Sequence, residues 1–279
     1  MAENNGWMAR DWAEEPPPAS DLRPEIPHPA RIYNALLGGK DNFPADRAAA
    51  ERLIALSPGI QAAARCNRVF LQRAVRLVSE LGIDQFLDIG TGIPSEGNTH
   101  EVAQQVNPAA RVVYVDNDPI VLAHARALMA GPGHGRTTVL QADLREPEKI
   151  LADPQVREAL DFDRPVALLL VAVLHFVDED QDPYRLVATL LDALPSGSHL
   201  ILSHGTGDFD PPADVAAGTD VYRKATAQVT PRSRAQLERF LTGLEPLEPG
   251  LVPAAAWRAE SAEEAATWAP GYAVVARKP

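Results

Sequence analysis

The sequence has one cysteine, Cys66, among its 279 residues. A single thiol can form neither a disulfide within the chain nor a cysteine-based zinc site. Basic residues are also scarce, because 26 Lys and Arg stand against 38 Asp and Glu and give a formal net charge of −12. Binding to nucleic acid or to an anionic membrane depends on clustered basic residues, so both kinds of partner are disfavoured. A neutral or cationic small-molecule substrate fits this charge better, and a homo-oligomer is possible.

Long apolar runs are missing as well. The run from Val166 to Leu174 falls well short of the roughly 18 residues that a membrane helix needs. The first 21 residues contain no apolar core of the kind found in signal peptides. With 46% hydrophobic and 23% charged residues, the composition is that of an ordinary globular protein. We therefore expect a cytoplasmic protein.

The chain divides into three expected parts. Residues 1–29 include the run Pro16–Pro18 and too few apolar residues to offset the entropy of ordering them, which predicts a flexible tail. Residues 30–82 have a helical pattern and are expected to form an N-terminal helical cap. This cap should end in an amphipathic helix closed by Gly82. Its apolar face is predicted to comprise Phe70, Ala74, Leu77, Val78 and Leu81.

Strand-like and helix-like segments alternate through residues 83–279. Strands are expected at 85–89, 111–116, 137–143, 166–174 and 199–204, with helices between them at 98–106, 119–129, 147–152, 154–160 and 183–194. This alternation predicts an α/β fold with a Rossmann-like, doubly wound, mostly parallel sheet of seven strands. Two further helices are expected near 213–228 and 233–244. The apolar segments 250–257 and 272–278 are candidates for an antiparallel hairpin at the sheet edge.

Two glycines follow the first expected strand, in the stretch "QFLDIGTGIPSEGN" (85–98). In doubly wound sheets ligands bind at the carboxyl ends of the strands. There, Gly90 and Gly92 would let a ligand approach the backbone more closely than any Cβ allows. An ordinary tight turn explains two glycines equally well, so the pair alone decides nothing.

Acidic residues end the next two expected strands. Asp116 lies 24 residues after Gly92, where a carboxylate can accept both hydroxyl groups of an adenosine ribose. The alternative role, capping the following helix, is better filled by Asp118 because Pro119 follows it. Asp143 can accept a hydrogen bond from an adenine amino group, or serve as a turn residue. Three matching strand ends favour a nucleoside-like ligand.

The residues after the second glycine discriminate between two ligands. A nicotinamide or flavin dinucleotide needs a third glycine so that its pyrophosphate can rest on the helix N-terminus, and here Ser95 lies at that position between Pro94 and Glu96. Glu96 would repel the pyrophosphate. S-adenosylmethionine has no phosphate, and its ammonium group would favour a carboxylate such as Asp88. The sequence therefore favours S-adenosylmethionine.

The segments "FLDIGTG", "VVYVDND", "ADLREP" and "LLLVAVLHFV" resemble the consecutive motifs of class I S-adenosylmethionine-dependent methyltransferases. More narrowly, "ARIYNALLGGKDNFPADR", "RCNRVFLQRAV" and "DIGTGIPSEGNTHEVAQ" resemble an actinobacterial S-adenosyl methyltransferase family first catalogued as a domain of unknown function. The resemblance extends from about residue 28 onward and implies S-adenosylmethionine as cofactor, S-adenosylhomocysteine as product and no bound metal. Pro94 replaces a glycine of many methyltransferases and implies a differently shaped loop. The residues assigned to the cofactor are Asp88, Gly90, Thr91, Gly92, Asp116, Asn117, Asp143, Leu144 and Val173.

The resemblance also implies a lid over the ligand site, although a helix end with a glycine cap is the alternative. The stretch "LGGKDN" (37–42) lacks the upstream glycine and the Ser or Thr after Lys40 that a phosphate loop requires. Acceptor specificity is expected to lie in segments 31–47 and 205–232. The expected lid residues are Tyr33, Asn34, Gly38, Gly39 and Asn42; the specificity segments add Phe43, Asp208, Phe209, Asp220 and Tyr222.

His175 follows the fourth expected strand, beside the place for a methyl acceptor, and is the candidate catalytic residue. As a general base it would need only moderate tuning, since the ordinary pKa of histidine lies near neutral pH. A structural role is the alternative. The acidic run 178–180 is expected to be a solvated loop, with binding of a cationic acceptor as the alternative. The arginines of the helix at 65–76 are expected to form a solvated face, or alternatively a patch that binds an anion or a partner; they are Arg65, Arg68, Arg73 and Arg76.

The leading hypothesis is a methyltransferase that acts on a small-molecule acceptor, which the sequence does not identify. A protein that binds S-adenosylmethionine or its product as a sensor, without catalysis, is the main alternative. It would need the same Asp116 and Asp143, so the sequence does not separate the two. A dinucleotide-dependent oxidoreductase ranks third.

Overall fold

The computed structural model describes residues 23–129 and 136–279, and for residues 126–129 only the backbone. Most of the expected proline-rich tail lies outside the described residues. The strands are β1 Gln85–Ile89, β2 Arg111–Asp116, β3 Thr137–Gln141, β4 Ala167–Val171, β5 His199–Gly205, β6 Glu245–Pro246, β7 Val252–Pro253 and β8 Gly271–Arg277. The helices are α1 Pro29–Leu36, α2 Pro44–Leu56, α3 Ile60–Glu80, α4 Thr99–Val106, α5 Pro119–Met129, α6 Pro147–Ala152, α7 Pro154–Ala159, α8 Pro183–Asp192, α9 Pro212–Tyr222, α10 Arg234–Glu238 and α11 Ala262–Ala265.

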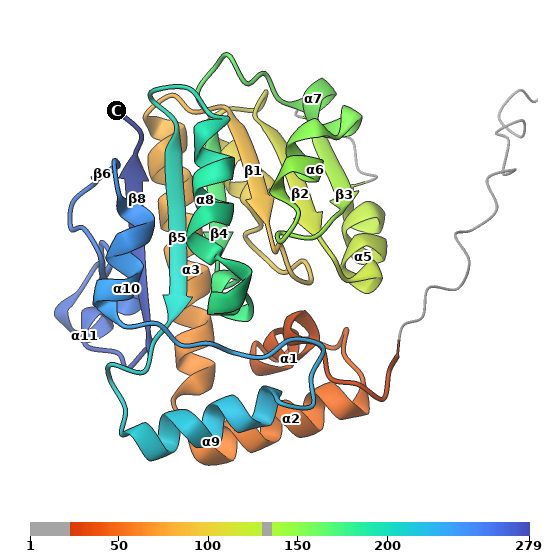
Figure 1. Cartoon of the computed structure of the whole chain (residues 1–279), viewed down its shortest axis with the longest axis vertical. Coiled ribbons are helices and arrows are strands. Elements are labelled where there is room, and N and C mark those ends of the chain that lie inside the picture. The colour runs from red at the N-terminus through yellow and green to blue at the C-terminus, as the bar shows by residue number, and fades with distance from the viewer. Residues whose placement is uncertain (1–22, 130–135) are drawn as a thin grey trace, which may run out of the picture.

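The strands form one sheet in which seven lie in the order β3-β2-β1-β4-β5-β8-β6, and β7 pairs with β8 beside them. Strands β1 to β5 are parallel, whereas β8 runs antiparallel to β5 (Figure 1). The strand order reverses between β1 and β4, which is where doubly wound sheets bind ligands. The predicted pairing of the two C-terminal apolar segments is confirmed only at β7, because residues 254–256 turn into a 3₁₀ helix.

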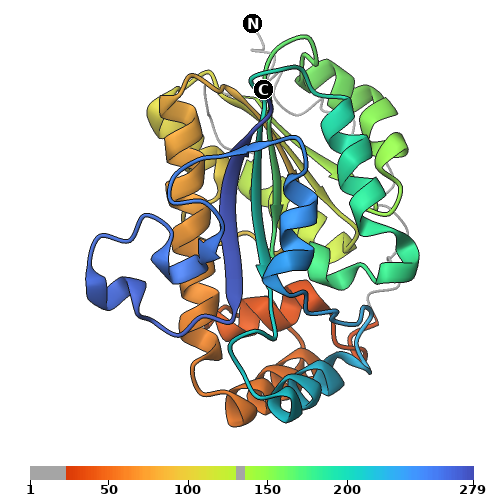
Figure 2. The same ribbon diagram turned by 60° about the vertical axis from the view of Figure 1, so that its left-hand side comes forward.

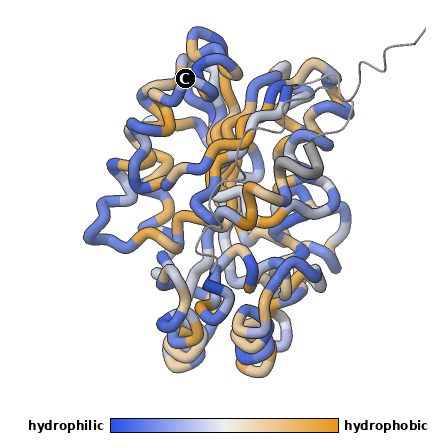
Figure 3. The backbone as a smooth tube through the Cα atoms, turned by 90° about the vertical axis from the view of Figure 1, so that its right-hand side faces the viewer, coloured by the Kyte–Doolittle hydropathy of each residue, from blue (hydrophilic) through white to orange (hydrophobic). Residues whose placement is uncertain are grey.

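Helices cover both faces of the sheet, and Figure 2 shows α3 on one face and α8 on the other. Alternate residues of each strand enter opposite cores, so Phe86 packs on the side of α3 and Leu87 on the side of α8. The hydrophobic segments of the chain accordingly run through the centre of the molecule (Figure 3). The expected apolar face of α3 is confirmed except at Leu81, which is 55% exposed. The helix ends at Glu80, and Gly82 turns the chain with φ +94°.

A helical cap covers the carboxyl ends of the parallel strands. It has its own core, in which Ile32 of α1 and Leu53 of α2 pack with Val221 of α9. Helices α2 and α9 lie side by side below the sheet in Figure 1, although about 155 residues separate their sequences. The helix expected near 213–228 ends at Tyr222, and the chain then crosses between the cap and the sheet toward α10. Within the described residues, no helix is long and apolar enough to span a membrane.

Candidate functional site

A cavity of about 630 Å³ lies between the carboxyl ends of the strands and the cap. All ten residues predicted for cofactor binding and catalysis line it, although they come from segments up to 87 residues apart. The parallel strands explain this convergence, because their carboxyl ends meet at one edge of the sheet. The lining residues in question are Asp88, Gly90, Thr91, Gly92, Asp116, Asn117, Asp143, Leu144, Val173 and His175.

The turn after β1 needs both of its glycines. Gly90 has φ +76°, and a Cβ there would lie 2.3 Å from a methyl carbon of Val173, so no larger residue fits. Gly92 has φ +68° with no atom near its ideal Cβ position, which leaves its cavity side open. Its backbone N–H donates to a carboxylate oxygen of Asp116 at 2.9 Å. The turn therefore brings bare backbone to the cavity and links the ends of β1 and β2.

Asp116 is a buried carboxyl group at the end of β2. Besides Gly92, it accepts a hydrogen bond from the backbone N–H of Asp118 at 2.9 Å, and Asp118 in turn caps α5 through the N–H of Ile120. Asp118 thus fills the capping role that the sequence assigned to it. Burial raises the pKa of Asp116 to about 6. Each carboxylate oxygen of Asp116 retains a second acceptor site, so the group can still accept ribose hydroxyls.

Asp88 is also buried, at the end of β1. One carboxylate oxygen accepts a 2.6 Å hydrogen bond from the hydroxyl of Thr99, the first residue of α4. Burial raises the pKa of Asp88 to about 6 despite this bond. A buried carboxylate is stabilised by a nearby cation, which makes Asp88 suited to the ammonium or sulfonium group of S-adenosylmethionine.

The N-terminus of α4 is capped by side chains of its own helix. Glu101 accepts hydrogen bonds from the backbone N–H groups of Gly97 and Asn98, at 2.8 and 3.2 Å. The side-chain oxygen of Asn98 accepts from the N–H of Ser95 at 3.0 Å. These are the donors that would hold a pyrophosphate in a dinucleotide-binding turn. Since Glu101 occupies two of these donors and Asn98 the third, the turn fits a ligand without phosphate better than a pyrophosphate.

Asp143, after β3, is paired within its own loop. The backbone N–H of Arg145 donates to one of its carboxylate oxygens at 2.9 Å, and the guanidinium of Arg145 donates to both oxygens, at 2.8 and 2.5 Å. The amide of Asn117 lies 3.5 Å from the second oxygen. Burial alone would raise the pKa of Asp143, but the hydrogen bonds and charge of Arg145 outweigh it and hold that pKa below its usual value. The adenine contact of Asp143 stays a prediction.

His175 lies just beyond β4, and its Nδ1 accepts a hydrogen bond from the N–H of Gly205 at 3.3 Å. Burial and then the charge of Arg232 lower the pKa of His175 to about 4. The imidazole is therefore neutral at pH 7, and its Nδ1 acceptor role assigns the proton to Nε2. The sequence anticipated a base tuned near neutral pH. The environment instead makes His175 a weak base and a hydrogen-bond donor.

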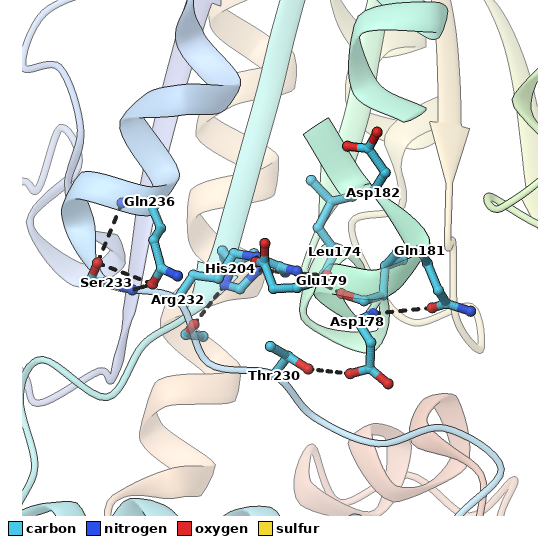
Figure 4. A network of polar contacts seen from close by, with 12 residues as sticks. Leu174, Asp178, Glu179, Gln181, Asp182, His204, Thr230, Arg232, Ser233 and Gln236 are labelled. Atoms are coloured by element: carbon cyan, nitrogen blue, oxygen red, sulfur yellow. Dashed lines mark hydrogen bonds and ion pairs between the residues drawn. The ribbon is translucent and has the colours of Figure 1, made fainter. Parts of the chain in front are cut away.

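Sequence reasoning missed Arg232, which is fully buried beside the cavity (Figure 4). Its guanidinium bonds to Glu179 at 2.8 Å, to the carbonyl oxygens of Leu174 and Val177 at 2.9 and 2.7 Å, and to His204 Nε2 at 3.0 Å. These contacts anchor residues 223–232, which we call the strap, across the ends of β4 and β5.

The acidic run 178–180 is solvent-exposed at Glu179 and Asp180, as expected of a solvated segment, but it also holds the strap. Glu179 binds Arg232, and Asp178 accepts a hydrogen bond from the hydroxyl of Thr230, as Figure 4 shows. Several strap residues line the cavity, so anchoring the strap shapes the site. The complementary charges of the acidic run and Arg232 were the only signal in the sequence, and they are 53 residues apart.

The expected lid residues are only partly in place. Tyr33 lines the cavity, and its hydroxyl donates to the carbonyl of Ala64 and accepts from Asn67, both at 3.0 Å. Asn34 and Asn42 instead bond to each other at 2.8 Å and do not line the cavity. Gly38 and Gly39 belong to the same turn, which follows α1, and this position fits the helix-end alternative. The movement of this stretch as a lid stays a prediction.

Only one of the other residues expected to determine specificity lies at the cavity. Of the five other residues expected to determine specificity, Tyr222 lines the cavity, and Phe43, Asp208, Phe209 and Asp220 do not.

The expected arginine face makes contacts within the fold. Arg68 lines the cavity and donates to the carbonyl oxygens of Glu96 and Gly97, at 3.3 and 3.1 Å. Arg73 pairs with Glu264 at 2.8 Å. The arginine face is therefore partly engaged in the fold rather than simply solvated.

Comparison with known proteins identifies the family. Residues 16–279 match the family described as S-adenosyl methyltransferase. A DUF574 family protein from Streptomyces avermitilis is 43% identical, with 92% of this chain and 100% of that chain covered and a TM-score of 0.88. A candidate methyltransferase from Thermobifida fusca is 42% identical, with coverages of 95% and 99% and a TM-score of 0.85.

A more distant structure shares the fold alone. Magnesium protoporphyrin IX methyltransferase from Synechocystis, crystallised with S-adenosylhomocysteine, is 13% identical, with 89% of this chain and 93% of that chain covered and a TM-score of 0.52. Among the curated proteins, no relative matches. The match over nearly the whole chain establishes that this protein belongs to the S-adenosyl methyltransferase family and is an S-adenosylmethionine-dependent methyltransferase.

Proposed function

We propose that this methyltransferase acts on a small molecule that binds inside the cavity. The observation that carries the proposal is that the cavity is covered on the side of His175. There the strap and α9 pass across the carboxyl ends of β4 and β5. A folded protein or a duplex nucleic acid would have to displace these elements to reach His175. A small molecule can be enclosed by them, and pockets of this volume are typical of small-molecule sites.

The cofactor residues fit their proposed roles. S-adenosylmethionine, when bound, supplies a methyl group that its sulfonium already activates. We assign Asp116 to the ribose hydroxyls and Asp88 to the cationic end of the cofactor, because both are buried acceptors facing the cavity. Thr91, Asn117 and Leu144 complete the walls near the ribose and adenine, and Gly90, Gly92 and Val173 set the closest approach of the backbone.

In this proposal the protein contributes positioning more than proton transfer. Holding two reactants in line can lower a barrier by roughly 7–11 kcal/mol in favourable cases, without a base. His175 is neutral and carries its free proton on Nε2, so we assign it to orienting the acceptor by donating a hydrogen bond. The cap covers the same space, and exclusion of water by a bound acceptor would strengthen such contacts.

The experiment uses S-adenosylmethionine with a labelled methyl group and a cell extract divided by ultrafiltration. The fraction of low molecular mass should accept label in the presence of the protein, whereas the retained fraction of proteins and nucleic acids should not. Heat-inactivated protein is the control. Label that appears only in the retained fraction would exclude a small-molecule acceptor, and no transfer to either fraction would favour a binding protein without catalysis.

A further inference from the structure

The two halves of the cavity differ in charge. Four arginines line the cavity, and all lie near the residues assigned to the cofactor. Arg145 pairs with Asp143, and Arg68 binds the loop after β1. Arg23 and Arg31 lie around His28, near Asp118. The other side, which we call the acceptor half, lies between the ends of β4 and β5, α9 and the segment before β8. Among the described residues lining it there is no lysine or arginine.

Two carboxylates line the acceptor half. Asp210 lies in the loop after β5 and Asp214 in the first turn of α9, and neither side chain has an ion pair or hydrogen bond to a described residue. The nearby imidazoles of His175 and His204 carry no compensating positive charge, since burial lowers the pKa of each. Arg232 lies behind these histidines, and Glu179 pairs with its charge. The acceptor half is therefore neutral to negative throughout.

Aromatic side chains form much of the remaining wall. The rings of Phe176 and Tyr222 lie 5.7 Å apart between centroids, and Tyr272 and Trp268 face the cavity from the segment around β8. A Cβ on Gly59 would lie 2.6 Å from the indole of Trp268, so this glycine lets the indole pack closely against the start of α3. Flat, polarisable walls favour planar ligands, and their faces attract cations.

The rim of this half is apolar and exposed. Leu56, at the end of α2, is 50% exposed and Trp268 is 36% exposed, and both line the cavity. Few large hydrophobic side chains of the described residues are this exposed, and such side chains at the mouth of a cavity mark a binding site. The rim lies across the cavity from Asp116 and α5, so an acceptor can enter without passing the adenosine end.

We propose that the acceptor half takes a planar, largely apolar molecule that is neutral or cationic, and rejects carboxylates, sulfates and phosphates; the proposal rests on the small-molecule function above. Burying an anion without a positive partner is costly, and here two carboxylates would add repulsion. A basic group on the acceptor would instead meet Asp210 or Asp214 near the rim, while the ring enters between the aromatic walls.

The test uses protein saturated with S-adenosylhomocysteine and two probes with the same ring and opposite charge, tryptamine and indole-3-propionate. Titration calorimetry should show tryptamine binding at least tenfold more tightly. In the double variant Asp210→Asn/Asp214→Asn this preference should fall below threefold, with the affinity for S-adenosylhomocysteine unchanged. The matched control is Asp163→Asn/Asp192→Asn, which removes the same charge from exposed positions that do not line the cavity and should keep the preference.

Three outcomes would overturn the inference: equal or tighter binding of indole-3-propionate, a preference that survives in the Asp210/Asp214 variant, or binding of neither probe. The labelled-methyl experiment is independent of these probes. Label transferred only to the retained fraction would overturn the small-molecule function itself, whereas transfer to the small-molecule fraction together with a reversed probe preference would overturn only the inference about charge.

Discussion

At the scale of single residues, the site buries two carboxyl groups. Their burial lowers the free energy of unfolding by an amount that depends on pH. Burial raises the pKa of Asp88 and of Asp116 to about 6, above the value near 4 expected in the unfolded chain. The folded protein therefore binds protons more readily than the unfolded chain between about pH 4 and 6. It follows that both groups lower the free energy of unfolding as pH rises through that window, and that the cost persists at pH 7.

Asp88→Asn should separate stability from function. The amide keeps an acceptor for Thr99 but removes the buried charge, so the Tm of the cofactor-free protein should rise at pH 7.5 and change less at pH 4.5. The shift in pKa bounds the gain at roughly 3 kcal/mol. Calorimetry should show at least tenfold weaker binding of S-adenosylmethionine, because its cation loses a counter-charge. The exposed Asp192→Asn is the control, and unchanged affinity in Asp88→Asn would contradict the assignment.

Asp116→Ala should weaken binding of the cofactor and also destabilise the fold. A charge-assisted acceptor for ribose hydroxyls contributes roughly 1.5–3 kcal/mol, so the Kd should rise about tenfold or more. Because Gly92 and Asp118 both donate to this carboxylate, we expect a lower Tm as well. If the variant binds the cofactor as tightly as the wild type in calorimetry, Asp116 does not contact the ribose and only stabilises the turn.

At the scale of elements, the sequence predicted what local patterns determine. The apolar run in β4 and the alternation of strands with amphipathic helices gave the parallel sheet, and the strand ends placed the ten site residues on one cavity. The strap was missed because its contacts are not local. Helix α9 ends at Tyr222, and the conformation of the chain beyond it depends on Arg232 reaching Glu179 and two carbonyl groups of another segment.

Arg232→Lys should loosen the strap. Lysine keeps the positive charge but cannot form the forked contacts to the carbonyls of Leu174 and Val177, so buried acceptors would lose partners. Glu179 is 46% exposed, so the cost comes mainly from the buried carbonyl acceptors. Leaving such an acceptor unsatisfied costs roughly 1–3 kcal/mol, and we expect a loss of about that size in urea unfolding. Trypsin should cleave faster after Arg223 or Lys224. Arg234→Lys, which alters an exposed pair with Glu238, is the control and should change neither.

The pKa of His175 is a second measure of whether the strap moves in Arg232→Lys, and it does not depend on the free energy of unfolding. The charge of Arg232 helps to lower that pKa, so the outcome in Arg232→Lys depends on whether the cation stays in place. If the strap moves away, the pKa of His175 should rise from about 4 toward its ordinary value, as measured by NMR titration of the imidazole. An unchanged pKa together with wild-type stability would mean that the strap is held without the guanidinium.

At the scale of the whole molecule, polar contacts connect the cap to the residues around the cofactor site. His28 Nδ1 lies 3.1 Å from a carboxylate oxygen of Asp118, and the N–H of Asp118 bonds to Asp116. On the other side, the hydroxyl of Tyr33 bonds to Asn67, whose side chain accepts from Ser203 of β5 at 2.5 Å. The cap therefore rests on the ends of the same strands that hold the ligand. The sequence analysis expected a cap from residues 30–82 and assigned acceptor specificity partly to 205–232, but it did not predict that α9 packs into the core of the cap.

Cofactor binding should consequently slow hydrogen exchange across the cap. A ligand that binds only the closed arrangement stabilises it by mass action and suppresses local opening. We expect slower exchange in residues 23–36, 60–68 and 212–222 with saturating S-adenosylhomocysteine, measured by mass spectrometry. Strand β4 should change little, because it is buried in both states, and NAD should produce no slowing, because Glu101 occupies the donors that a pyrophosphate needs. Exchange in the cap that ignores saturating S-adenosylhomocysteine would mean that the cap is a static cover, and that the acceptor reaches the cavity through the rim at Leu56 and Trp268 without any opening of α1.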